Sequence, residues 1–342
     1  MVRRKSTNLQ FLRFIAALAV LFCHSFSIVE GKIDGEWIYK LTGGQLDFGV
    51  LAVCIFFFFS GFLVLKSLDR LKTGSQYFRA RAVRLFPPLW FVTILVIIIC
   101  SMFSSLGPAA YFRAPGTWKY LLNNLLIPVH DLPGVFLSHP YGSTVNGSLW
   151  TLPLEALCYI GCFIAWKTKL TEKRRFIIVL ALVVAVWGFL FYSKTGLYRL
   201  GLIAYPCVFF VLGMAFYIFR DSIVIRWRYL PVLCLVLVLL CIAGIGRIGL
   251  LISWPYIIYS TAFGQYQMKG FLPKLGDYSY GIYLWGFPVQ QALMELIRNG
   301  MNVYLNFLIA AVVSTCLGAV TYYLVENRVS FKGKHSKGQG QS

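Results

Sequence analysis

Charged residues are scarce in this chain, and acidic residues most of all. Only 13% of the 342 residues are charged, with 12 Asp and Glu against 32 Lys and Arg. About a quarter of the residues of an ordinary water-soluble domain are charged, whereas this sequence is 58% hydrophobic and 17% aromatic. These proportions exclude a soluble globular protein, and they predict an all-α, polytopic membrane protein that lies in a lipid bilayer.

Two further classes of site are disfavoured. The formal charge of +20 is high, but the basic residues form short clusters between apolar runs, which is the pattern of membrane topology and not of a nucleic-acid groove. All nine cysteines lie in apolar runs, where a thiol behaves as a small hydrophobic group. Cys158 and Cys162 share a helix face without further ligands, so we interpret them as packing residues and expect no metal site.

Apolar runs near 20 residues long are typical of transmembrane helices. Ten such runs are present, and we expect each of them to cross the membrane. The predicted spans are residues 9–29, 47–67, 86–104, 149–166, 175–192, 198–219, 230–246, 248–263, 277–297 and 303–325.

The distribution of Lys and Arg predicts the orientation of these spans. Most of the basic residues lie at the amino end, in every second loop and in the tail. Because cytoplasmic loops carry the excess of Lys and Arg, we expect both termini in the cytoplasm. No repeat or appended soluble domain is visible, so residues 1–330 are interpreted as one transmembrane domain and residues 331–342 as a disordered basic cytoplasmic tail.

The longest connection, residues 105–148, then lies on the outer side of the membrane. Its apolar stretch, residues 118–128, is too short to span a bilayer, so we expect a short re-entrant or interfacial helix that caps the outer face. His130, Asp131 and His139 lie in this connection. They are candidates to contact a substrate, although loop residues of this kind are more often simply solvated.

The first span carries two ionisable residues, Arg13 and His24. They are eleven positions apart, so a helix returns them to nearly the same face, with a rise of roughly 16 Å between them. Ionisable groups in membrane helices are costly, and they usually face a protein interior or a water-filled cavity. A signal peptide is the alternative, but both residues interrupt its apolar region and many spans follow.

Glu155 is predicted at the same depth as His24. With the expected topology, His24 lies roughly 7 Å below the outer end of the first span and Glu155 roughly 9 Å below the outer end of the fourth. A carboxylate that holds a neutral imidazole is a common arrangement for a general base. The alternative is a His–Glu pair that only holds two helices together.

Arg81 and Arg84 precede the third span. Three positions apart, they point to one side if this segment is helical, and the arginine fork suits phosphate oxygens. An ordinary positive-inside anchor is the alternative, and on these residues alone it is the stronger interpretation. With Arg13 near the same side of the membrane, the cluster suggests a phosphorylated ligand that enters from the cytoplasm.

The ordered motifs of the chain resemble those of the acyltransferase-3 family of membrane proteins, over nearly the whole length. Members of that family begin with a helix that contains an arginine, then ten residues, then a histidine. The matches are Arg13 to His24, Phe56-Phe57, Ser60-Gly61-Phe62, Arg81 to Arg84 before Phe86-Pro87, Ser148-Leu149-Trp150 before Glu155 and Tyr159, Gly276 to Trp285 with Phe287-Pro288, and Tyr322 to Glu326.

The resemblance implies an acyl-CoA-dependent O-acyltransferase of the bacterial cytoplasmic (inner) membrane. Its co-substrate would be acyl-CoA, in the first place acetyl-CoA, and its acceptor a hydroxyl of a cell-surface glycan or a lipid-linked sugar. It implies that His24 is the base or acyl-handling residue and that Arg13, Arg81 and Arg84 bind the coenzyme A end. Glu155 would orient the imidazole, and Ser60 is a candidate for stabilising the oxyanion.

The chain departs from the family pattern at two positions. Cys54 stands where many relatives have an acidic residue, and Gly286 where many have a histidine. Gln290 and Gln291 follow one turn later, either lining the cavity or packing, and Glu295 is expected to be an interfacial or helix-packing residue. A transporter or flippase for a glycolipid is the alternative function, since buried Arg, His and Glu also suit a permeation path.

Overall fold

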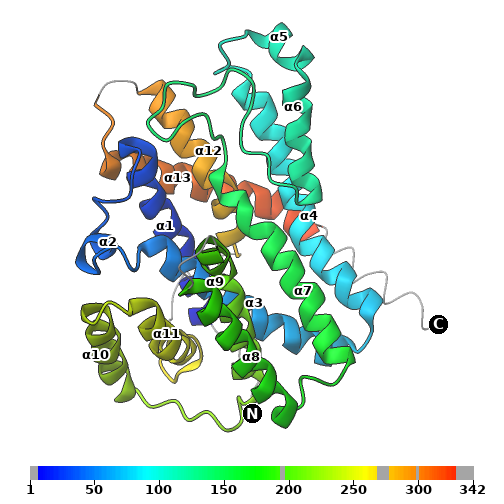
Figure 1. The fold of residues 1–342 in the computed structure, drawn as a ribbon. Coiled ribbons are helices and arrows are strands. Elements are labelled where there is room, and N and C mark those ends of the chain that lie inside the picture. Colours follow the sequence, from blue (N-terminus) through cyan, green and yellow to red (C-terminus); the bar gives the residue numbers. More distant parts are fainter. Residues whose placement is uncertain (1–6, 193–196, 268–276, 298–299, 329–342) are drawn as a thin grey trace, which may run out of the picture. The chain divides into compact units, whose positions relative to one another are not determined.

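The computed structural model describes residues 7–192, 197–267, 277–297 and 300–328, and these residues are almost entirely helical (Figure 1). Strands are absent from these ranges apart from a single bridge between Asp131 and Thr144. The long helices are α1 (Thr7–Glu30), α3 (Phe48–Leu71), α4 (Gly74–Cys100), α7 (Thr151–Lys167), α8 (Lys173–Phe191), α9 (Leu197–Ile218), α10 (Tyr229–Ile242), α11 (Gly246–Phe263), α12 (Ser279–Leu296) and α13 (Val303–Thr321).

Within the described ranges, seven helices are long and apolar enough to cross a membrane, which confirms an all-α, polytopic membrane protein. These are residues Asn8–Glu30, Phe48–Leu71, Gly74–Cys100, Gly147–Lys167, Lys173–Phe191, Leu197–Ile218 and Val303–Glu326. The other three predicted spans are also helices, but α10 has only 14 residues, and α11 and α12 contain Pro, Gly and polar side chains. The count of ten and the cytoplasmic termini stay predictions, and the predicted tail, residues 331–342, lies outside the described residues.

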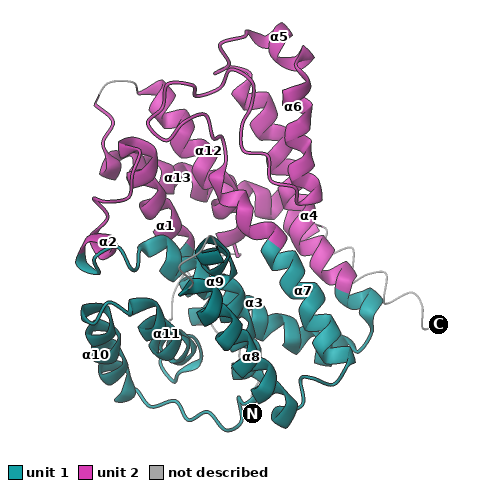
Figure 2. Ribbon diagram, in the orientation of Figure 1, with its two compact units in different colours: residues 1–16, 41–77, 154–273 teal, residues 17–40, 78–153, 274–342 magenta. Residues whose placement is uncertain are grey.

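The chain divides into two compact units (Figure 2). Unit 1 comprises residues 1–16, 41–77 and 154–273, and unit 2 comprises residues 17–40, 78–153 and 274–342. Each unit is therefore assembled from segments that lie far apart in the sequence.

In unit 1, helices α3 and α9 approach each other through glycines. A Cβ atom at Gly61 would lie 1.9 Å from the carbonyl oxygen of Phe210, and one at Gly213 would lie 1.9 Å from the carbonyl oxygen of Phe58. Small residues allow the backbones of membrane helices to approach this closely. The side chain of Asp47 accepts a hydrogen bond from the Val50 N–H at 2.7 Å, and it thereby caps the start of α3.

Adding one methyl group at this crossing is expected to destabilise the protein. In Gly61→Ala the new Cβ meets backbone, which cannot rotate away, so α3 and α9 must separate; overpacking of this kind costs roughly 1–3 kcal/mol. We expect a lower midpoint in thermal unfolding of the detergent-solubilised protein. Gly161→Ala in α7 is the control, because nothing lies within 4 Å of its Cβ position. Equal midpoints for the two variants would contradict the tight crossing.

Helix α4, most of which belongs to unit 2, begins at Gly74, twelve residues before the predicted start at residue 86. The connection after α3 is therefore short, and Arg81 and Arg84 lie within the helix and not in a loop. The prolines Pro87 and Pro88 signal a break because each removes a backbone N–H. The helix nevertheless continues, since the buried side chains that follow, among them Leu89, pack into a large apolar cluster.

The connection 105–148 folds onto α4 in unit 2. It forms α5 (Pro108–Arg113), α6 (Pro115–Lys119) and a 3₁₀ helix at Tyr120–Leu125, all too short to span a bilayer, and it lies beside α4 (Figure 1). Tyr111 and Tyr120 are buried in the same cluster as α4. Burial raises the pKa of both phenols, so each stays neutral, and the Tyr111 hydroxyl donates to the carbonyl of Ile97 at 3.0 Å.

Candidate functional site

Arg13 and His24 both lie on α1, which is unbroken from Thr7 to Glu30. Residues eleven positions apart on such a helix differ by about 20° around the axis and by roughly 16 Å along it. The guanidinium of Arg13 lies 6.0 Å from the centroid of the Phe56 ring in unit 1. The predicted helix is therefore present, with a cation toward its start and an imidazole toward its end.

The imidazole of His24, in unit 2, contacts an aromatic ring, but one of its ring nitrogens has no hydrogen bond to the described residues. Its ring contacts Phe287 edge to face, with centroids 5.1 Å apart and planes at 69°. Nδ1 is buried and has no hydrogen-bond partner among the described residues. Buried polar atoms in folded proteins are nearly always paired, so each exception calls for an explanation. A ring nitrogen left unbonded in a membrane-spanning helix is consistent with a group that acts on a ligand.

Two glycines, Gly147 and Gly286, leave space for close packing around Phe287, the residue that contacts His24. A Cβ atom at Gly147 would lie 2.9 Å from the Phe287 ring, and one at Gly286 would lie 2.5 Å from Leu21 of α1. The glycine at position 286 thus lets α12 pack closely on α1. Gly286 therefore has a packing role in unit 2.

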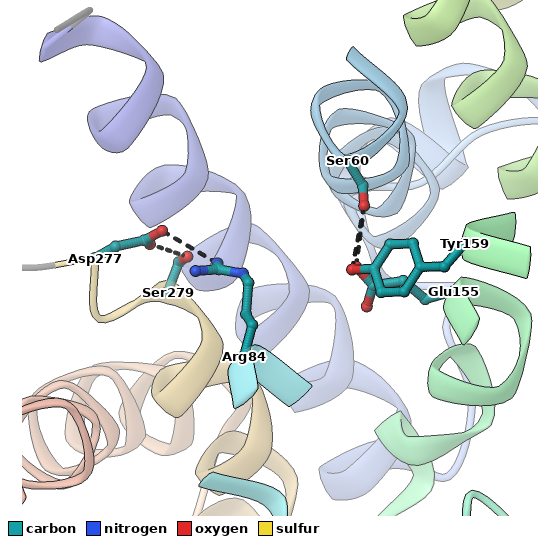
Figure 3. A network of polar contacts seen from close by, with 6 residues as sticks. All are labelled: Ser60, Arg84, Glu155, Tyr159, Asp277 and Ser279. Carbon is teal, nitrogen blue, oxygen red and sulfur yellow. Dashed lines mark hydrogen bonds and ion pairs between the residues drawn. The ribbon is translucent and has the colours of Figure 1, made fainter. Parts of the chain in front are cut away.

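Glu155 accepts hydrogen bonds from two neighbouring side chains in unit 1 (Figure 3). Ser60 of α3 donates to Glu155 Oε1 at 3.1 Å, and the Tyr159 hydroxyl, one turn further along α7, donates to the same oxygen. The backbone of this turn is held in addition by Tyr77, whose hydroxyl donates to the Tyr159 carbonyl at 2.9 Å. Because His24 belongs to unit 2, its pairing with Glu155 stays a prediction.

Arg81 and Arg84 lie one turn apart on α4 in unit 2, and both are partly buried, whereas Arg79 is exposed. Arg84 Nη2 contacts Asp277 Oδ2 at 3.2 Å, and Ser279 Oγ donates to the other oxygen of Asp277 at 2.6 Å (Figure 3). Sequence reasoning missed this ion pair. The only signal was an acidic residue in the motif that opens the α12 region.

The remaining candidate residues hold unit 2 together. His139 contacts Gln291 Oε1 through Nδ1 at 2.7 Å and Glu295 Oε2 through Nε2 at 3.0 Å. Gln290 is buried, and its amide donates to the Leu21 carbonyl and to Ser25 of α1. Gln290 therefore joins α12 to α1, whereas Gln291 and Glu295 join α12 to His139 of the outer connection. Whether the glutamines also line a cavity, and whether Glu295 is interfacial, stay predictions.

His130 and Asp131 lie in the connection that folds onto α4. His130 Nδ1 is 3.0 Å from the carbonyl oxygen of Asn146, and Asp131 accepts a hydrogen bond from Ser143 at 3.2 Å. Both side chains therefore fasten the two sides of this connection to each other. Their contact with a substrate stays a prediction.

A polytopic helical protein with an unsatisfied histidine and clustered arginines has the features of an integral membrane enzyme. A family model described as an acyltransferase domain matches residues 6–324. The chain therefore belongs to the acyltransferase-3 family, and it is an O-acyltransferase. This confirms the resemblance that the motifs indicated.

Two relatives add detail. An O-acetyl transferase of Shigella phage Sf6 is 29% identical over 338 residues, which cover 95% of this chain and 96% of that protein. Nodulation protein 10 of Rhizobium leguminosarum bv. viciae is 29% identical over 165 residues, or 45% of this chain and 42% of that protein. No solved structure matches.

Proposed function

We propose that this protein transfers an acetyl group from cytoplasmic acetyl-CoA to a hydroxyl of an extracytoplasmic glycan or lipid-linked sugar, with His24 as the base. The observation that carries the proposal is the buried, unpartnered Nδ1 of His24 in a chain that belongs to an acyltransferase family. The acetyl group is favoured because the phage relative that matches nearly end to end is named an O-acetyl transferase. The location that we propose is the bacterial cytoplasmic membrane, which would separate cytoplasmic acetyl-CoA from an extracytoplasmic acceptor.

The proposed step is a direct acyl transfer. The imidazole of His24 takes the proton of the sugar hydroxyl while that oxygen attacks the thioester carbonyl. The C–S bond then breaks, an O-acetyl ester forms, and the proton passes from the imidazolium to the sulfur of coenzyme A. Atoms and charge balance without any further reactant.

Arg81 and Arg84 are proposed to bind the phosphates of acetyl-CoA, with Arg13 as a further cation at the coenzyme end. Guanidinium groups one turn apart on α4 can each direct several N–H donors at phosphate oxygens. Asp277 holds one side of the Arg84 fork, so it would limit the directions in which this guanidinium points. The cytoplasmic position of this end is the orientation that the basic loops predict.

Glu155→Gln is expected to lower kcat about tenfold or more and to leave the KM for acetyl-CoA nearly unchanged. The amide keeps the size of the side chain, and its oxygen can still accept from Ser60 and Tyr159, but it no longer stabilises an imidazolium. Initial rates at saturating acceptor separate kcat from KM. The control is Tyr159→Phe, which removes only one of the donors to this carboxylate. An unchanged kcat in Glu155→Gln would remove this residue from the mechanism.

Reconstitution of the purified protein in vesicles tests the function as a whole. Labelled acetyl-CoA is supplied on one side and lipid-linked glycans on the other, and label in the glycan is counted. Transfer that requires His24 supports the proposal. Movement of the glycolipid across the bilayer without coenzyme A, and without label transfer, would contradict it and would favour the transporter.

A further inference from the structure

The segment His139–Gly142 of unit 2 is fixed at both ends by one side chain. Gln291 Oε1 of α12 accepts a hydrogen bond from His139 Nδ1 at 2.7 Å, and the amide nitrogen of Gln291 donates to the carbonyls of Gly142 at 3.3 Å and Thr144 at 2.7 Å. This short segment is therefore attached to a long helix and does not behave as an open loop.

Three further contacts involve the same segment. His139 stacks on Phe136, with centroids 4.9 Å apart and planes at 17°, and its Nε2 contacts Glu295. At the end of α1, Gly31 has a φ of +73°, and a Cβ atom there would lie 3.0 Å from the Pro140 carbonyl oxygen. The segment is thus held by α12, by the outer connection and by the residue that follows α1.

These contacts present the ring of Tyr141 beside the candidate base. Tyr141 meets Phe287 edge to face with centroids 5.3 Å apart, and Phe287 in turn meets His24 at 5.1 Å. The two distances place the Tyr141 ring within roughly 10 Å of the imidazole. Phe287 is 1% exposed, whereas Tyr141 is 41% exposed. Part of the Tyr141 side chain is therefore packed, and part of it is exposed.

We propose that Tyr141 binds the acceptor, with a sugar ring packed against its exposed surface so that a hydroxyl of the sugar lies beside His24. This inference rests on the proposed function and adds the residue that recognises the acceptor. The glycan is thereby bound by a rigidly held aromatic side chain of the outer connection, and not only by the membrane-spanning helices.

The chemistry of the two partners is complementary. The face of an aromatic ring carries negative charge density, and the C–H bonds on one side of a pyranose present slightly positive hydrogens to it. Burial raises the pKa of the Tyr141 phenol, so the hydroxyl stays neutral and can donate to a sugar oxygen. Because His139, Gln291 and Glu295 already hold the segment, little conformational entropy is lost when the sugar binds.

The test compares Tyr141→Leu with Tyr141→Phe in the purified full-length protein. Labelled acetyl-CoA is the donor, and the probe acceptors are methyl hexosides and lipid-linked glycans extracted from membranes of the source cells. Leucine keeps apolar packing on Phe287 but offers no ring, so we expect the acceptor KM to rise about tenfold and the KM for acetyl-CoA to stay unchanged. Phenylalanine keeps the ring, and its acceptor KM is expected to stay within about threefold of the wild type.

Three outcomes decide the inference. A rise in the acceptor KM alone supports it, and the same rise in Gln291→Leu, which releases the segment, supports the positioning role. An unchanged acceptor KM in Tyr141→Leu, or equal changes in both KM values, overturns it while wild-type transfer still supports the proposed function. A wild-type protein that transfers label to none of the probes overturns both.

Discussion

Replacing His24 with alanine or glutamine is expected to lower the rate of acetyl transfer by about a hundred- to ten-thousand-fold, which is the usual contribution of a general base. The hydroxyl of a sugar is a weak nucleophile until its proton is removed, and we propose that this proton passes to His24, whose Nδ1 has no hydrogen-bond partner among the described residues. Neither alanine nor glutamine can accept a proton at neutral pH. The measurement is label transfer from acetyl-CoA to glycan by purified protein of matched concentration.

His130→Gln is the matched control for this variant. His130 is also in unit 2, and its Nδ1 lies 3.0 Å from the Asn146 carbonyl oxygen, so glutamine can preserve a hydrogen bond there. We expect its rate to stay within about threefold of the wild type. Size-exclusion profiles of the variants in detergent report folding. If His24→Gln is folded and keeps more than about a tenth of the wild-type rate, another residue must act as the base.

Removing the guanidinium groups of Arg81 and Arg84 is expected to give the second large effect, on the affinity for acetyl-CoA. Hydrogen bonds to charged groups contribute roughly 1.5–3 kcal/mol each, and each 1.4 kcal/mol corresponds to a factor of ten in affinity. The double variant Arg81→Ala with Arg84→Ala should therefore raise the KM for acetyl-CoA about a hundredfold or more. Because phosphate contacts act equally on ground state and transition state, kcat should change little.

Arg79→Ala offers a close control, since it removes the same charge from the same helix. Arg79 is exposed, whereas Arg81 and Arg84 are partly buried. We expect the control to raise the KM slightly at low salt and not at all at high salt, because exposed charges are screened. The single variants Arg81→Ala and Arg84→Ala are compared with Arg79→Ala. Equal KM changes in these three variants would indicate an ordinary positive-inside anchor and would remove the phosphate site from the proposal.

Much of the fold could be predicted because its signals are local. A run of apolar residues specifies a membrane helix by its own length, so each predicted span corresponds to a helix. The prediction of helix boundaries was wrong where tertiary packing outweighed a local sequence rule. The apolar run predicted a span that starts at residue 86, yet α4 begins at Gly74 and continues through Pro87 and Pro88, because the residues around the prolines pack into the apolar cluster of unit 2.

The candidate site was predicted only in part. The spacing of Arg13 and His24 along one helix follows from helical geometry, and the structure confirms that helix. The hydrogen-bond and ion-pair partners of the polar residues could not be predicted from the sequence. Glu155 bonds to Ser60, 95 positions away, and Arg84 contacts Asp277, 193 positions away. Hydropathy shows that a segment crosses the membrane, but it does not show which face meets which neighbour.

The sequence by itself thus determined the class of protein, the helices and the family, because composition, run length and ordered motifs are properties of the chain alone. Tertiary structure decided which side chains meet: Ser60 with Glu155, Asp277 with Arg84, and His139 and Tyr141 with α12. The physical reason is that these contacts depend on side-chain packing between segments far apart in the chain. Close helix packing at glycines such as Gly61 and Gly286 brings the segments within reach of one another.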